Sequence, residues 1–345
     1  MRAVPLAFTG SGAQLRRHGR RDFLINLVLG GLWTSVARRH AMEYLETHTT
    51  VDGTPLARVP VRKSRWPAIL LVVDFIAARV ANELGYGPPL PVVIACGLVL
   101  LPYLWATVAA RGIDAIRWRE LQLSFAPGWL QVYRSCWPLL VLGIAWVFAE
   151  PHVAQAAAEP ETITMPWRMG FAASLLVVLP LIALQAFEFR RLRFTRTHVG
   201  DCPVAWTARF GPYLRLWLLA VLAFVVSAVL PVLALRYALF GTLTLEGMDP
   251  LEAAAVYTGA LLLILLLSAP ARAWFEARAF VQSWDGLRVG DQVHVACALD
   301  VRAFVAMRAK DAVRTLLTCG HHRPEAVVKA WQAKLAALKV ETAAG

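Results

Sequence analysis

Three polar side chains lie in or at the ends of long apolar runs, where they could take part in transport chemistry. Asp74 is in the middle of AILLVVDFIAARV, and Gln185 and Glu188 end a later run. A charge at membrane depth is costly unless it faces a cavity or a partner, so such residues often mark solute or ion pathways. The three form our candidate membrane-buried polar site. For Asp74, a pathway role and a structural role both stay open. For Gln185 and Glu188, hydrogen bonding between helices or anchoring at the membrane interface is the preferred interpretation.

Motifs for other chemistry are missing from the sequence. It contains no Walker loop, G-x-S-x-G, H-E-x-x-H or dinucleotide fingerprint. His321 and His322 near Cys319 lack a neighbouring carboxylate, which favours a solvated turn over a metal site. The five cysteines are odd in number and form no C-x-x-C pair, which indicates reduced, structural thiols. We therefore predict no enzymatic activity, no cofactor and no metal.

The composition points to a lipid bilayer as the surroundings of these residues. Hydrophobic residues make up 58% of the 345-residue chain and charged residues only 17%, whereas soluble domains carry about a quarter charged residues. The net charge of +12 would suggest nucleic-acid binding in a soluble protein. In a membrane protein the same excess collects on the cytoplasmic side, so we expect a lipid bilayer as partner and no nucleic acid.

Six apolar segments are long enough to cross about 30 Å of hydrocarbon at about 1.5 Å per residue. The sequence therefore predicts an α-helical integral membrane protein whose six transmembrane helices form three hairpins. Proline, glycine and tryptophan mark the segment ends, as helix starts and interfacial anchors do. The predicted spans are 67–84, 89–109, 132–149, 166–187, 213–236 and 254–272.

The positions of the charges orient these spans. All but three of the 35 lysines and arginines fall in four segments. The alternate connections contain no lysine or arginine, and the two longer ones contain acidic residues. Basic loops stay in the cytoplasm, so both termini are predicted there and the connections near 85–88, 150–165 and 237–253 outside. The four basic segments are 1–65, 110–135, 188–215 and 271–345.

Other apolar stretches are less suited to crossing a membrane. The run 23–37 has arginine clusters on both sides, so we predict an interfacial or re-entrant helix. Charges interrupt 300–319, which predicts a surface helix, and 325–340 has the periodicity of an amphipathic helix. At the end of the sixth span, Arg272 and Glu276 are spaced for an i, i+4 ion pair.

A short alternating motif recurs on the predicted cytoplasmic side, with two spans between successive copies. Its copies lie near 50–59, 121–126, 197–206 and 287–297. Alternation is typical of strands with one buried face, and glycine permits a tight turn. We predict that the copies are extended and that at least two pair into a cytoplasmic sheet. The chain would then divide into a cytoplasmic segment 1–65, a membrane region 66–272 and a cytoplasmic segment 273–345.

The order of these pieces resembles the YjgN-type family of bacterial inner-membrane proteins, a domain of unknown function. The likeness covers most of the chain; its departures include Glu120, where the second copy lacks its glycine. It implies a multi-pass inner-membrane protein and brings no activity, substrate or cofactor. The pieces that carry it are Phe8–Gly12, Asn26, Leu29-Gly30, Trp33, Arg38-Arg39, Tyr44, Thr50, Gly53 and the stretches 102–125, 180–206 and 285–295.

Two functions from different classes follow from this architecture. A transporter or channel-like protein would place a polar pathway for an unknown small solute among the hairpins. A membrane scaffold or adaptor would instead bind a protein partner through its cytoplasmic strands. A water-accessible cavity around Asp74 would favour transport, and a solid bundle with an exposed sheet would favour the adaptor.

Overall fold

The computed structural model describes residues 2–28, 33–59, 89–158, 165–240 and 249–342, together with isolated positions between 69 and 80. The chain forms two compact units. The terminal unit consists of residues 1–58 and 215–345, and the central unit consists of residues 59–214. Each unit contains antiparallel strands as well as helices. The predicted division into two cytoplasmic segments and a membrane region concerns the side of the membrane and stays a prediction.

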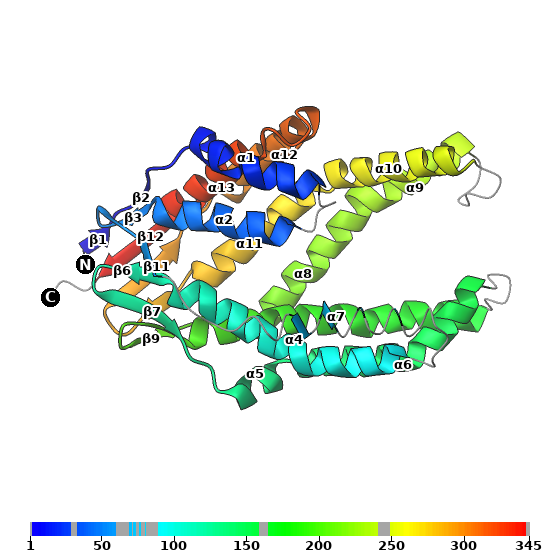
Figure 1. Ribbon diagram of the computed structural model, residues 1–345, viewed down its shortest axis with the longest axis horizontal. Coiled ribbons are helices and arrows are strands. Elements are labelled where there is room, and N and C mark those ends of the chain that lie inside the picture. Colours follow the sequence, from blue (N-terminus) through cyan, green and yellow to red (C-terminus); the bar gives the residue numbers. More distant parts are fainter. Residues whose placement is uncertain are drawn as a thin grey trace. The chain divides into compact units, whose positions relative to one another are not determined.

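The central unit repeats the order helix, then β-hairpin. Helices α6 and α7 lie side by side (Figure 1), and the antiparallel strands follow the order β6-β7-β8-β9, with Leu123 opposite Val199. Trp105 of α4 stacks on Phe189 of α7 with ring centroids 4.1 Å apart. Its elements are α4 (Pro89–Asp114), β6 (Ile116–Trp118), β7 (Leu121–Phe125), α5 (Trp129–Ser135), α6 (Trp137–Ala158), α7 (Met165–Thr195), β8 (Thr197–Val199) and β9 (Cys202–Ala205).

The terminal unit brings both ends of the chain together. Strand β1 pairs with β12, so that Val4 lies opposite Val340. Its elements are β1 (Arg2–Val4), β2 (Leu6–Phe8), α1 (Gly12–Val28), α2 (Thr34–Thr47), β3 (Thr49–Val51), β4 (Thr54–Pro55), β5 (Ala57–Arg58), η2 (Val225–Val229), α9 (Leu230–Phe240), α10 (Pro250–Leu267), α11 (Ala269–Trp284), β10 (Leu287–Val289), β11 (Val293–Cys297), α12 (Val301–Leu317), α13 (Arg323–Ala337) and β12 (Leu338–Thr342). Helix α8 (Phe210–Phe224) begins in the central unit and ends in this one.

The end of the chain differs from the prediction of one amphipathic helix over 325–340. Helix α13 ends at Ala337, and Leu338 begins strand β12. This strand has β1 on one side and β11 on the other. The helical periodicity of the sequence continues past Ala337, but two neighbouring strands supply backbone partners that make the extended conformation more stable there.

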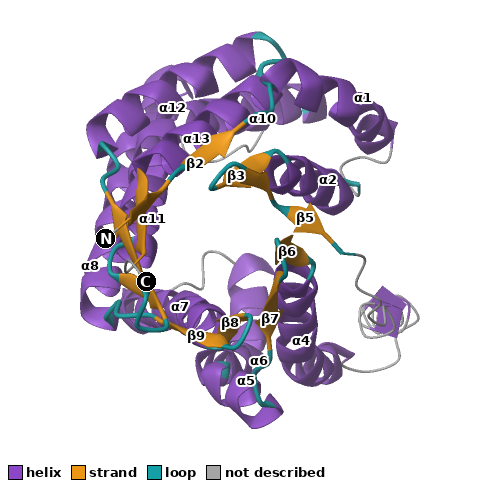
Figure 2. Ribbon diagram, turned by 90° about the vertical axis from the view of Figure 1, so that its left-hand side faces the viewer, coloured by secondary structure: helices purple, strands orange, loops and turns teal. Residues whose placement is uncertain are grey.

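Strands occupy all four copies of the repeated motif, and β7 of one copy pairs with β8 of the next, as predicted. Figure 2 shows the strands as short elements beside the long helices. Gly53, Gly200 and Gly290 have positive φ at the turns. In the second copy, Arg119 has a φ of 54°. Arg119, and not Glu120 as the sequence predicted, therefore takes the place that glycine has in the turns of the other copies.

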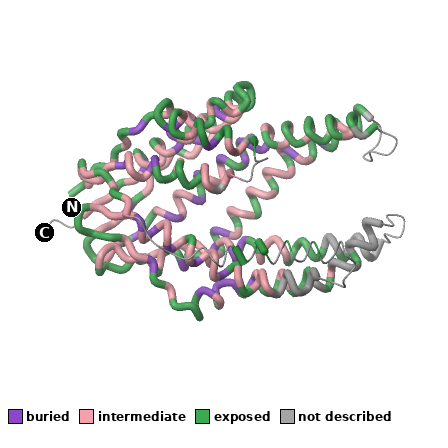
Figure 3. Tube along the Cα trace, viewed as in Figure 1, coloured by how far each residue is buried: buried purple, intermediate pink, exposed green. Residues whose placement is uncertain are grey.

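Three described helical stretches are long and apolar enough to cross a membrane, or four if a bent pair counts as one span. They are Cys96–Asp114, Ala173–Thr195 and Phe210–Leu239, and the bent pair is α10 with α11. Apolar side chains on them are exposed, such as Leu176 at 75%, and exposed stretches recur along these helices in Figure 3. Of the other predicted spans, 132–149 contains the shorter apolar helix Trp137–Trp146, and most of 67–84 lies outside the described residues.

The predicted span 254–272 is not one straight helix. It breaks at Ser268, and the axes of α10 and α11 differ by 42°. Pro270, in the first turn of α11, has no N–H and its ring clashes with the preceding turn, which explains the bend. Arg272 donates to the carbonyl of Leu265 at 2.6 Å.

The predicted pair of Arg272 with Glu276 is therefore wrong. Glu276 instead accepts from Lys334 of α13 at 2.6 Å and pairs with Arg308 of α12 at 3.4 Å. These contacts connect α11 to the two helices that follow it. Helix α12 packs along α11, which accounts for the surface helix predicted at 300–319. The run 23–37 is divided between the end of α1 and the start of α2, and residues 29–32 lie outside the described part.

Candidate functional site

The three residues predicted to form a polar site fall in different surroundings. Asp74 lies outside the described residues. Gln185 and Glu188 lie three positions apart on α7, in the part of this helix that packs near α5. The structure therefore brings Gln185 and Glu188 into one region and leaves the role of Asp74 as a prediction.

Gln185 connects α7 to the junction between α5 and α6. Its side chain is buried, its Nε2 donates to the carbonyl of Ser135 at 3.3 Å, and its Oε1 accepts from the N–H of Leu139 at 3.2 Å. Helix α5 ends at Ser135 and α6 begins at Trp137, so these are backbone groups of the kind that helix ends leave without partners. Gln185 thus has a structural role: it supplies hydrogen-bond partners to backbone groups at the junction of α5 and α6.

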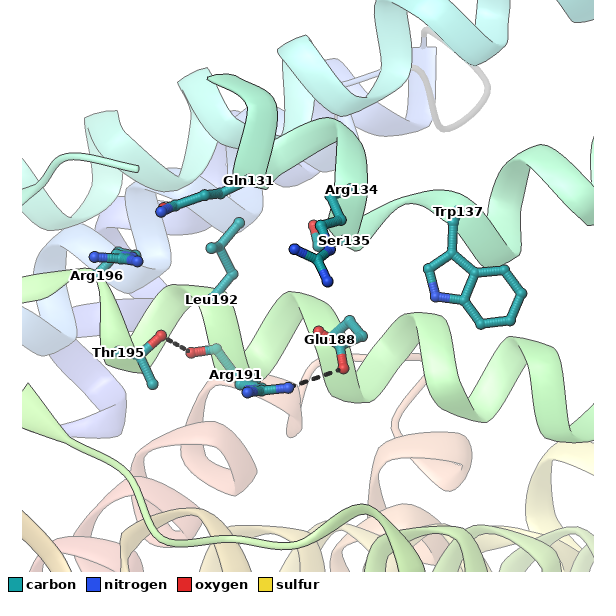
Figure 4. Close-up of a pocket in the computed structure, with 9 residues that line it drawn as sticks. All are labelled: Gln131, Arg134, Ser135, Trp137, Glu188, Arg191, Leu192, Thr195 and Arg196. Atoms are coloured by element: carbon teal, nitrogen blue, oxygen red, sulfur yellow. Dashed lines mark hydrogen bonds and ion pairs between the residues drawn. The ribbon is translucent and has the colours of Figure 1, made fainter. Parts of the chain in front are cut away.

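Glu188 lines a cavity of about 480 Å³ between α5 and α7, which we call the arginine cavity. Figure 4 shows the side chains of the two helices on either side of this space, with Trp137 at one end. The lining is mainly polar or charged. It consists of Gln131, Arg134, Ser135, Trp137, Glu188, Arg191, Leu192, Thr195 and Arg196.

The charges of the arginine cavity do not balance. Arg191 and Glu188 approach to 3.5 Å, with the Arg191 side chain 60% exposed, so their attraction is weak. Among the described residues, the guanidinium groups of Arg134 and Arg196 form no ion pair or hydrogen bond. The lining of the cavity therefore contains three guanidinium groups and one carboxylate. Guanidinium groups bind phosphate and carboxylate through paired N–H donors, so this cavity suits an anion.

The arginine cavity lies at the polar end of an apolar helix. Between Arg168 and Glu188 the sequence of α7 contains no charged residue, and four arginines then follow within residues 190–196. Trp137, at the start of α6, is 46% exposed, as is typical of tryptophan at a membrane–water interface. An anion bound here would therefore sit at the boundary between hydrocarbon and water.

Sequence reasoning identified Glu188 but missed the arginines around it. Arg134, Arg191 and Arg196 were counted only as charges that orient the membrane topology. Arg134 is more than fifty residues from the other two in the sequence. No sequence pattern indicates that α5 and the end of α7 are in contact. Only the packing of these helices shows that the three side chains share one space.

The fold and the cavity define a mainly helical membrane protein with a cationic site at the end of an apolar helix. Residues 3–345 match the family described as "Bacterial protein of unknown function (DUF898)". The chain therefore belongs to that family, which is the one that the sequence resembled. No curated protein sequence and no solved structure matched the chain.

Proposed function

We propose that the chain is a six-span protein of the bacterial inner membrane, with three helix hairpins and both termini in the cytoplasm. The distribution of basic residues supports this topology, since the connections predicted outside contain no lysine or arginine. A reporter enzyme that is active only outside the cytoplasm should be inactive when fused after Gly200. Activity of that fusion would contradict the topology.

Within this topology, we propose a transporter or channel-like function in which the arginine cavity binds an anionic solute at the cytoplasmic face. The observation that carries the proposal is the convergence of Arg134, Arg191 and Arg196 on one space of about 480 Å³ with Glu188 as the only carboxylate in its lining. The inside-positive bias explains why arginines are present in this part of the chain. It does not require them to line the same cavity, and it would be satisfied if they pointed apart.

Phosphate and carboxylate are the two chemical groups that suit these guanidinium donors. The volume is within the range of about 300–1,000 Å³ that holds small-molecule ligands. Trp137 lines the same space, so its fluorescence provides a direct readout. Titration of the purified full chain with inorganic phosphate or succinate should change this fluorescence, and Trp137→Phe should remove the change.

Two substitutions should move the anion affinity in opposite directions. Arg134→Gln removes an unpaired donor and should weaken binding about tenfold, the scale of one charge-assisted hydrogen bond. Glu188→Gln removes the competing carboxylate and releases Arg191, so binding should tighten about twofold to fivefold. Arg288→Gln is the matched control, because Arg288 is exposed on β10 and does not line the cavity.

Flux measurements separate transport from binding alone. Proteoliposomes that contain the protein should take up the anion that changes the fluorescence, and Arg134→Gln should slow this uptake. If neither Arg134→Gln nor Glu188→Gln changes binding relative to Arg288→Gln, the anion site is wrong. The alternative, an adaptor that acts through the strand hairpins, would then be favoured, and proximity labelling from the cytoplasmic side would test it.

A further inference from the structure

A second cavity, of about 1050 Å³, lies within the terminal unit beside the bend between α10 and α11; we call it the bend cavity. The four helices α10 to α13 contribute to its lining. Because α12 packs along α11 and α11 departs from the axis of α10 by 42°, the last turns of α10 are left facing this space. The break at Ser268 thus creates the cavity.

One wall of the bend cavity is apolar and belongs to α10, the first helix of the bent pair that together is long and apolar enough to cross a membrane. Leu262, Leu265 and Leu266 of α10 line it, and Leu262 and Leu265 are 42% and 44% exposed. They lie in the last two turns before the break, and other apolar side chains of α10, such as Tyr257 and Leu261, are also exposed. This wall therefore suits a hydrocarbon chain.

The carboxylates of the bend cavity already have cationic partners. Glu276 contacts Lys334 and Arg308. The buried Asp311 contacts His322 at 3.0 Å and Lys329 at 3.8 Å. His321 and His322 lie in the predicted turn and His321 is exposed, but the His322 ring is partly buried against Asp311 instead of solvated. Neither carboxylate neutralises the two other arginines in the lining.

Two guanidinium groups in the bend cavity thus lack a counter-ion. Arg272 donates to the Leu265 carbonyl, which carries no full charge. Arg323, at the start of α13, is exposed, and its side chain contacts no carboxylate within the part of the chain that the structure describes. Both side chains line the space that the leucines border. The bend cavity therefore joins an apolar wall to an unbalanced positive charge.

We propose that the bend cavity binds a phospholipid with a net anionic headgroup. Its phosphate would contact Arg272 and Arg323, and one acyl chain would lie along Leu262, Leu265 and Leu266. Charge complementarity selects an anionic over a zwitterionic lipid, since basic pockets at helix ends on the cytoplasmic side bind such headgroups. The apolar wall and the large volume favour a lipid over free phosphate, which would leave most of the cavity unfilled. This site is separate from the arginine cavity.

The test measures which lipids the intact chain retains. The purified full chain is exchanged into nanodiscs that contain equal amounts of phosphatidylglycerol and phosphatidylcholine, and the lipids released with the protein are counted by native mass spectrometry. Arg323→Gln should lower bound phosphatidylglycerol about tenfold. Arg314→Gln, an exposed arginine on α12 outside the cavity, should leave it unchanged. Arg323 is the better test position because Arg272 also holds the bend.

Four other results of this experiment would contradict the lipid site or part of it. Equal retention of phosphatidylcholine and phosphatidylglycerol by the unmodified protein would overturn the charge argument. Displacement of the lipid by millimolar inorganic phosphate would show that the site binds free phosphate, and would also overturn the proposal. A parallel loss in Arg323→Gln and Arg314→Gln would assign the effect to overall charge. Leu265→Asn should reduce lipid retention without reducing phosphate binding to the arginine cavity, and failure of this separation would count against the acyl-chain contact.

Discussion

Replacement of Gln185 by leucine tests whether this residue acts structurally at the junction of α5 and α6. Leucine has a similar size, but it removes the donor to the Ser135 carbonyl and the acceptor for the Leu139 N–H. The Leu139 N–H also donates to the Cys136 carbonyl at 3.0 Å, so it keeps one partner. The main loss therefore falls on the Ser135 carbonyl.

The expected cost follows from these contacts. A hydrogen bond contributes about 0.5–1.5 kcal/mol to the free energy of unfolding, and a buried group left without a partner costs about 1–3 kcal/mol. With one acceptor stranded and one donor still bonded, Gln185→Leu should cost about 2 kcal/mol. At about 2–4 °C per kcal/mol for a domain of this size, the melting temperature in detergent should fall by about 4–8 °C.

The assay compares the melting temperature of Gln185→Leu with that of Gln131→Leu. Gln131 is exposed and lines the arginine cavity, so its replacement should change the free energy of unfolding by less than about 0.5 kcal/mol. Hydrogen exchange at the Leu139 amide should be faster in Gln185→Leu alone. If the melting temperature of Gln185→Leu lies within about 1 °C of that of the unmodified protein, Gln185 does not stabilise the junction.

Two further predictions concern turns and acid stability. Arg119→Gly should stabilise the chain by about 0.5–1 kcal/mol, because glycine adopts positive φ without the cost that arginine has there. Gly200→Ala should destabilise it, because φ is +58° and an added Cβ would lie 3.1 Å from Leu121; equal effects of the two changes in thermal unfolding would refute this. At Asp22, burial raises the pKa, but hydrogen bonds from Trp33 and His40 outweigh it, so that the pKa lies below 3.8. The carboxylate therefore stabilises the fold above its ordinary pKa, and this contribution is lost as the pH falls through the lowered value; Asp22→Asn should destabilise at pH 7, and the difference should shrink in acid.

Local sequence patterns were sufficient to predict a helical membrane protein with strands at four repeated positions. Long apolar runs can remain in hydrocarbon only as helices, because every backbone group must be bonded internally. The glycines at 53, 200 and 290 take the left-handed conformations that turns need. These signals are carried by neighbouring residues, so one sequence reveals them without knowledge of the packing.

Other features depend on contacts between residues that are far apart in the chain. Leu338–Thr342 continues a helical pattern but becomes a strand because β1 and β11 are beside it. Pro270 is visible in the sequence, but the 42° bend between α10 and α11 and the hydrogen bond from Arg272 to the Leu265 carbonyl are seen only in the structure.

The candidate site divides in the same way. Glu188 was predicted because a carboxylate at the end of an apolar run is conspicuous in the sequence. Arg134 and Arg196 were not predicted as its neighbours, since they lie on different elements and their charges are also explained by membrane orientation. The sequence by itself determined where the charges lie along the chain and predicted that they share one side of the membrane. The tertiary structure decided which of them line one cavity, because only the packing of α5 against α7 brings those side chains together.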